Sequence, residues 1–179
     1  MKIKSLTVFC GSKSGKNPAY VLEAASLGKW MALNEIELVY GGGNKGLMGA
    51  IANACLDHGG KVLGIIPKFL LEWEAQHNGL TELILTENMH DRKKLLYEKA
   101  DAAMVLPGGM GTLDELFEML TWNNLKIHSK KIYILNVDGY YNTLLHFLEH
   151  IDSEGFLYDQ WKDRFIICNS TAEFIQLFS

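Results

Sequence analysis

Short apolar runs alternate along this chain with longer segments in which apolar residues recur at helical spacing. The short runs are rich in β-branched residues, and several are apolar throughout, which is the pattern of strands covered on both faces. Strands are therefore predicted over residues 6–10, 37–40, 61–66, 82–85, 102–106, 132–135 and 165–168. Helices are predicted over residues 19–34, 48–58, 89–99, 112–125, 141–154 and 171–178.

This alternation predicts an α/β fold with a doubly wound, mainly parallel sheet and helices on both faces. In such sheets ligands bind beyond the carboxyl ends of the strands, where the strand-to-helix loops converge. Three of those loops are rich in glycine or other small residues, namely 11–15, 41–46 and 107–112. A binding site is therefore expected where these loops meet.

Composition narrows the class of protein. The 179 residues are 48% hydrophobic, which suits one domain over residues 1–179. The net charge of -4 comes without blocks of like charge, so nothing favours a nucleic-acid or membrane partner. The first apolar run is too short for a signal peptide or membrane span, and a cytoplasmic location is expected. Cys10, Cys55 and Cys168 are far apart and are interpreted as buried, reduced thiols without a metal.

Two of the glycine loops resemble nucleotide motifs incompletely. Residues 41–46 satisfy G-x-G-x-x-G, but the next strand ends in Ile66-Pro67-Lys68 and lacks the acidic residue that holds a dinucleotide's ribose, which disfavours NAD. The loop from Gly11 resembles a P-loop with its glycines one residue too close and Asn17 where Ser or Thr should hold magnesium, which disfavours a nucleoside triphosphatase. Both loops stay candidates to support a phosphate, through Gly11, Ser12, Gly42 and Gly43.

The third loop carries Gly108, Gly109 and Gly111 directly before the predicted helix at Thr112. Flexible backbone beside the positive end of a helix is typical of a phosphate cradle. The alternative is that Thr112 and Glu115 form a T-x-x-E capping box, in which Glu115 only stabilises the helix. A helix needs one cap residue rather than three glycines, which favours the cradle.

Arg92, Lys93 and Lys94 lie early in a predicted helix, where the macrodipole disfavours cations. The ordinary explanation of such a run is a solvated charged face. The functional interpretation is an anion site in which the guanidinium of Arg92 forks onto a phosphate or ribose oxygen.

Residues 89–93, Met-His-Asp-Arg-Lys, and 107–115, Pro-Gly-Gly-Met-Gly-Thr-Leu-Asp-Glu, closely resemble the LONELY GUY family of cytokinin-activating phosphoribohydrolases. The resemblance begins at residues 8–12 and continues through 121–122, 127–128, 136–142 and 154–156. It thus covers almost the whole chain.

The resemblance implies a Rossmann-like fold, a homodimer, and hydrolysis of cytokinin nucleotides or AMP to the free base and ribose 5-phosphate, without a cofactor. Arg92 and Glu115 match the family's catalytic pair. The region 69–88 around Glu74 departs most from the family pattern. Family substrate contacts fall on Glu74, Lys93, Gly109, Met110, Gly111, Thr112, Leu113, Asp114 and Thr121.

Breaking an N-glycosidic bond places positive charge on the ribosyl ring, which a carboxylate near the anomeric carbon stabilises. Glu115 is the candidate for that carboxylate, Arg92 for fixing the ribose or its phosphate, and the amides of residues 109–112 for binding the phosphate. A non-catalytic nucleotide carrier is the alternative, since the same loops would hold a phosphorylated ligand without chemistry. An older label for such sequences, lysine decarboxylase, normally relies on pyridoxal phosphate, and no lysine has a recognisable Schiff-base context.

Overall fold

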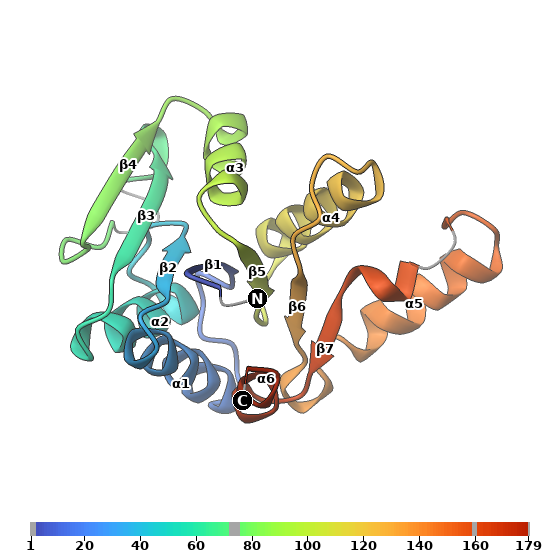
Figure 1. Cartoon of the computed structure of the whole chain (residues 1–179), viewed down its shortest axis with the longest axis horizontal. Coiled ribbons are helices and arrows are strands. Elements are labelled where there is room, and N and C mark those ends of the chain that lie inside the picture. Colours follow the sequence, from blue (N-terminus) through green and yellow to red (C-terminus); the bar gives the residue numbers. More distant parts are fainter. Residues whose placement is uncertain (1–2, 72–75, 159–160, 179) are drawn as a thin grey trace.

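The computed structural model describes residues 3–71, 76–158 and 161–178. Seven strands form one sheet in the order β4-β3-β2-β1-β5-β6-β7, and every pair of neighbours is parallel (Figure 1). The strands are β1 (Ser5–Phe9), β2 (Glu37–Tyr40), β3 (Val62–Pro67), β4 (Glu82–Thr86), β5 (Ala102–Val105), β6 (Ile132–Leu135) and β7 (Ile166–Cys168). The helices are α1 (Ala19–Leu33), α2 (Gly46–Asp57), α3 (Met89–Glu98), α4 (Met110–Asn124), α5 (Asn142–Ser153) and α6 (Thr171–Gln176), with short 3-10 turns η1 (Lys68–Leu70), η2 (Val137–Gly139) and η3 (Trp161–Arg164).

The doubly wound parallel sheet is confirmed. The chain runs from β1 outward to β4 and then returns to the other side of β1 with β5, so the strand order reverses between β1 and β5. The predicted strands end within one residue of the observed ones because their boundaries follow the continuous apolar runs, and every residue of β1, β5 and β6 is buried.

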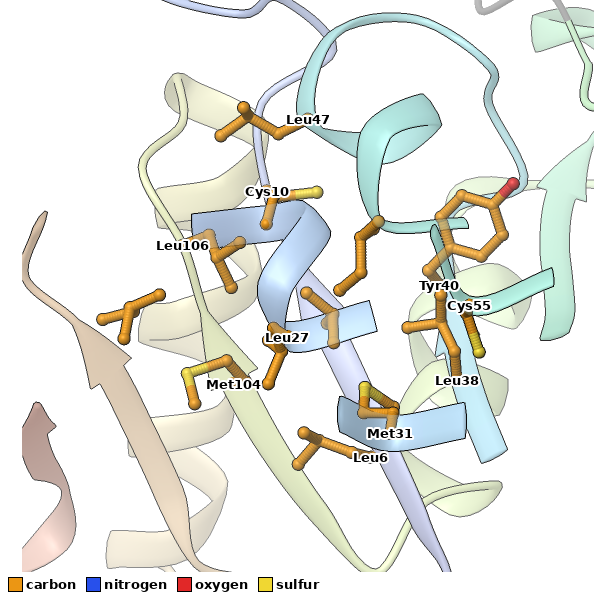
Figure 2. Close-up of a cluster of buried hydrophobic side chains, with 14 of the residues drawn as sticks. Leu6, Cys10, Leu27, Met31, Leu38, Tyr40, Leu47, Cys55, Met104 and Leu106 are labelled. Atoms are coloured by element: carbon orange, nitrogen blue, oxygen red, sulfur yellow. The ribbon is translucent and has the colours of Figure 1, made fainter. Parts of the chain in front are cut away.

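Consecutive strand residues pack against opposite layers, as the pleat requires. Leu38 of β2 lies in the cluster beneath α1, α2 and α6, whereas Val39 lies in the cluster beneath α3, α4 and α5. Helices therefore cover both faces of the sheet. Figure 2 shows the first cluster, in which the sheet residues Leu6, Leu38 and Met104 meet the helix residues Leu27, Met31 and Cys55.

The three cysteines are buried and unpaired with one another, as predicted. Burial raises the pKa of Cys55 to about 11, and burial with the nearby charge of Glu173 raises the pKa of Cys168 to about 11. These two thiols are therefore neutral at pH 7 and poor nucleophiles. Among the described residues, no helix combines the length and the apolar character that crossing a membrane would require.

Candidate active site

A cavity of about 510 Å³ lies at the carboxyl ends of β1 and β5, where the strand order reverses. This is the position at which doubly wound sheets bind ligands. The loops after β1 and β5 and the starts of α3 and α4 form its walls. The cavity brings together ten of the residues singled out in the sequence: Gly11, Ser12, Arg92, Gly108, Gly109, Met110, Gly111, Thr112, Asp114 and Glu115.

The start of α4 differs from the prediction. The helix begins at Met110 with Gly109 as its N-cap residue, whose extended backbone (φ -97°, ψ -154°) precedes the first turn. Thr112 is thus the third helical residue and is only 3% exposed. The capping-box interpretation of Thr112 and Glu115 is therefore wrong, because the cap position falls on a residue without a side chain.

That start places the first amides of the helix beside the cavity. The N–H of Leu113 is the first to close a helical hydrogen bond, to the carbonyl of Gly109 at 3.1 Å. The N–H groups of Met110, Gly111 and Thr112 precede it, and such amides at a helix start carry the positive end of the macrodipole. All three residues line the cavity, so the arrangement suits an anion.

Glycine occupies positions in this loop for two different structural reasons. A Cβ at Gly108 would lie 2.1 Å from Oγ1 of Thr112, so the backbone needs glycine to pass the first turn of α4. A Cβ at Gly109 or Gly111 would meet no described atom within 4 Å. Both residues line the cavity, so glycine at these positions keeps side-chain atoms off this part of its wall.

Arg92 is buried rather than solvated, with 5% of its surface exposed. Its Nε donates to the carbonyl of Ile65 at 3.1 Å and its Nη2 to the carbonyl of Gly41 at 3.1 Å. A Cβ at Gly41 would lie 2.3 Å from Nη2, so this glycine lets the guanidinium reach the backbone. The first glycine of the G-x-G-x-x-G pattern thus makes room for Arg92, which presents a fixed cation to the cavity.

Lys93 does not line the cavity, and its side chain reaches carboxylates of α4. Its Nζ lies 2.7 Å from a carboxylate oxygen of Glu118 and 3.1 Å from one of Asp114. Burial by itself lowers the pKa of Lys93, but the hydrogen bonds and charges of Glu118 and Asp114 outweigh it and raise the pKa above its ordinary value. Tyr97 adds a hydrogen bond to Glu118 at 2.9 Å. This network fixes α3, which carries Arg92, against α4, which carries Glu115.

Replacing Lys93 with methionine is expected to lower the free energy of unfolding by about 1 to 2 kcal/mol, since it leaves the half-buried Glu118 without its cation. Lys94→Met is the matched control, because Lys94 is exposed and lies 3.8 Å from Glu98, so its removal should change stability by less than about 0.5 kcal/mol. Urea unfolding measures both. Because the pKa of Lys93 is raised, the difference should persist at neutral pH and shrink only above about pH 10.4. If both variants lose the same stability, Lys93 does not stabilise the contact between α3 and α4.

Other candidates lie outside the cavity. Leu113 packs in the layer beneath α3 and α4, and the hydroxyl of Thr121 donates to the carbonyl of Phe117 at 2.7 Å. Gly42, at φ +80°, packs against Ile66, and Gly43 bridges to Gln76. Glu74 lies outside the described residues.

The sequence interpretation missed two aromatic walls of the cavity, Tyr20 of α1 and Tyr140 before α5. Their rings meet edge to face with centroids 5.4 Å apart. The hydroxyl of Tyr140 donates to the carbonyl of Gly108 at 2.6 Å. The available signal was positional: Tyr140 follows β6, the neighbour of β5, so its loop had to lie beside the glycine loop.

A family model described as "Possible lysine decarboxylase" matches residues 48–178. A cytokinin riboside 5'-monophosphate phosphoribohydrolase of Rhodococcoides fascians is 47% identical over 166 residues, covering 92% of this chain and 84% of that protein. The chain belongs to the LONELY GUY family. The Arabidopsis thaliana member LOG7, with the same activity in its name, is 48% identical over 157 residues, covering 87% of this chain and 72% of that one.

The LONELY GUY fold extends to more distant solved structures. The molybdenum cofactor binding protein of Rippkaea orientalis superposes with a TM-score of 0.73 at 22% identity, covering 99% of this chain and 96% of that one. The molybdenum cofactor carrier protein of Chlamydomonas reinhardtii has a TM-score of 0.74 at 18% identity, with the same coverage. At such identities the likeness concerns the fold alone, which serves unrelated functions.

Proposed function

We propose that this chain, as a single domain over residues 1–179, hydrolyses the N-glycosidic bond of adenine-type nucleoside 5'-monophosphates. The substrates are cytokinin riboside 5'-monophosphates and AMP, and the products are the free base and ribose 5-phosphate. One observation carries the proposal: a cation (Arg92), a carboxylate (Glu115) and the backbone of residues 109–112 line the same cavity. The names of the relatives supply the substrate class.

In the proposed complex the 5'-phosphate binds at the start of α4. At about 1.5 Å of rise per residue, Glu115 lies about 5 to 8 Å further along the helix than the amides of Met110 to Thr112. Helical side chains tilt toward the N-terminus, so the carboxylate projects back toward the phosphate loop. A nucleotide held by its phosphate therefore presents its ribose to Glu115.

The carboxylate of Glu115 stabilises the positive charge that develops on the ribosyl ring as the base departs, and it accepts a proton from the attacking water. The hydroxide of that water joins the anomeric carbon, and the departing base takes a proton from solvent. Arg92 binds the ribose or its phosphate. Its hydrogen bonds to the carbonyls of Ile65 and Gly41 fix the guanidinium before substrate arrives, so little reorganisation is needed.

The residues do not fit the pyridoxal phosphate that a lysine decarboxylase would need. That cofactor is held by a desolvated lysine whose amine can lose its proton. Among the described residues, the lysine that lines the cavity is Lys13, which is exposed. Lys93 is paired with Glu118 and Asp114, which raises its pKa.

Product release tests the proposal. The purified protein is incubated separately with AMP and with isopentenyladenosine monophosphate, and the base and ribose 5-phosphate are followed by chromatography. We expect both products in equal amounts from at least one nucleotide, and the ratio of the rates gives the preferred substrate. If both nucleotides bind tightly but neither releases a base, the protein is a nucleotide carrier rather than a hydrolase.

We further propose a homodimer formed through α4. Met110 and Phe117 are seven residues apart, so they lie on one face of this helix, and they are 86% and 38% exposed. Leu125 at the end of the helix is 62% exposed. Exposed apolar surface of this kind is typical of protein interfaces. Light scattering measures the mass of the protein in solution. A mass equal to that of one chain would reject the dimer.

A further inference from the structure

The segment 136–142 after β6 carries part of the family resemblance but has no role in the chemistry above. It comprises η2 and the turn into α5, and it places two consecutive tyrosines, Tyr140 and Tyr141, beside the loop that follows β5. The hydroxyl of Tyr140 donates to the carbonyl of Gly108 at 2.6 Å, and that of Tyr141 to the carbonyl of Leu106 at 2.6 Å.

Three successive carbonyls of that loop are thereby held. Between the two tyrosine contacts, the carbonyl of Pro107 accepts the N–H of Gly11 at 3.0 Å. A carbonyl oxygen carries partial negative charge and repels an anion, whereas an N–H attracts one. Hydrogen bonds from protein donors hold all three carbonyl oxygens, so these oxygens do not turn toward an anion at the start of α4.

The contact of Tyr140 also fixes an amide. A peptide unit is planar and trans, so the N–H of Gly109 points to the side opposite the carbonyl of Gly108. Gly108 and Gly109 are flexible residues that could rotate this peptide, because glycine has access to many backbone conformations. The hydroxyl of Tyr140 selects one orientation and so determines where the first amide of the phosphate loop points.

The tyrosines are themselves held firmly. The side chain of Asn136 accepts the N–H of Tyr141 at 2.7 Å and donates to the side chain of Asn142 at 2.9 Å. Asp138, at φ +50°, accepts a hydrogen bond from the side chain of Asn17 at 2.6 Å. This contact ties the segment to the loop after β1. Tyr141 is 2% exposed and packs edge to face on Tyr140, with ring centroids 4.8 Å apart.

We propose that Tyr140 and Tyr141 are positioning residues that hold the loop 106–109 in its anion-binding conformation, an inference that rests on the proposed binding of the substrate phosphate at that loop. They act through the backbone of the loop rather than by touching the bond that breaks. We call this pair the tyrosine clamp. Its removal weakens recognition of the phosphate and leaves recognition of the base unchanged.

The test compares ligands with and without the phosphate. Wild type and Tyr140→Phe are titrated by calorimetry with ribose 5-phosphate and, separately, with adenine. The variant keeps the ring and loses only the hydroxyl, and Tyr140 is 40% exposed, so folding should be preserved. We expect ribose 5-phosphate to bind about tenfold more weakly and adenine to change by less than about twofold. Tyr158→Phe, at a tyrosine that is 75% exposed, is the matched control and should change neither.

Equal weakening for both ligands would overturn the clamp, since a general loss of structure or a contact with the base would produce it. Unchanged affinity for ribose 5-phosphate would overturn it as well. Tyr141→Phe is titrated in the same way, after its thermal unfolding has been shown to match wild type. It should also bind ribose 5-phosphate more weakly. The titration does not depend on turnover, so it tests the clamp separately from the proposed hydrolysis. If wild type does not cleave nucleotides but Tyr140→Phe still binds ribose 5-phosphate more weakly, the proposed hydrolysis is rejected and the clamp is supported.

Discussion

Replacing Glu115 with glutamine is expected to lower kcat for nucleotide hydrolysis by about a thousandfold or more, because the amide can neither stabilise an oxocarbenium-like ring nor accept the proton of the attacking water. Binding should stay largely intact, since the proposed phosphate contacts come from the backbone of residues 109–112 and from Arg92, which line the cavity. The rate of base release measures the first effect, and calorimetric titration with ribose 5-phosphate measures the second.

Glu118→Gln is the control on the same helix. Glu118 lies one turn further along, does not line the cavity, and receives hydrogen bonds from Tyr97 and Lys93 that an amide oxygen can also accept. It should therefore keep kcat within about threefold of wild type. Near-normal turnover by Glu115→Gln would remove Glu115 from the mechanism. Equal losses in both variants would point to a disturbed α3–α4 contact.

The sequence predicted the sheet well because its strands are buried on both faces and read as continuous apolar runs. It misplaced the start of α4, because T-x-x-E has the same letters whether Thr112 caps the helix or lies inside its first turn. Only the backbone of Gly109 decides between these, and glycine carries no side-chain signal.

The site was predictable where its residues follow a strand directly. The loop after β5 was found because strand-to-helix loops of parallel sheets converge. Arg92 was found from its place early in a helix, where the macrodipole disfavours a cation, and from the family resemblance. Contacts between residues that are distant in the sequence were not predictable. The contact of Gly41 with Arg92 spans 51 residues and that of Tyr140 with Gly108 spans 32, and neither follows from local spacing. The pairing of Lys93 with Glu118 depends on how α3 packs on α4, which the separate patterns do not specify.

Removing the 5'-phosphate from the substrate is expected to lower kcat/KM by about a thousandfold, so adenosine should react far more slowly than AMP. The phosphate is remote from the bond that breaks, and its binding energy can be used to hold the ribose against Glu115 in the transition state. In the proposed complex the guanidinium of Arg92 and the amides of Gly109 to Thr112 supply that energy, and they lose their anion when the substrate is a nucleoside.

Initial rates of adenine release from AMP and adenosine, measured over a range of concentrations, give kcat and KM separately. If the phosphate positions the ribose, adenosine loses kcat as well as affinity, because saturating the site with nucleoside does not restore the geometry. A change in KM alone would mean that the phosphate only adds affinity. Equal values of kcat/KM for the two substrates would show that the start of α4 does not bind a phosphate during turnover, and the cavity would then need a different orientation of its substrate.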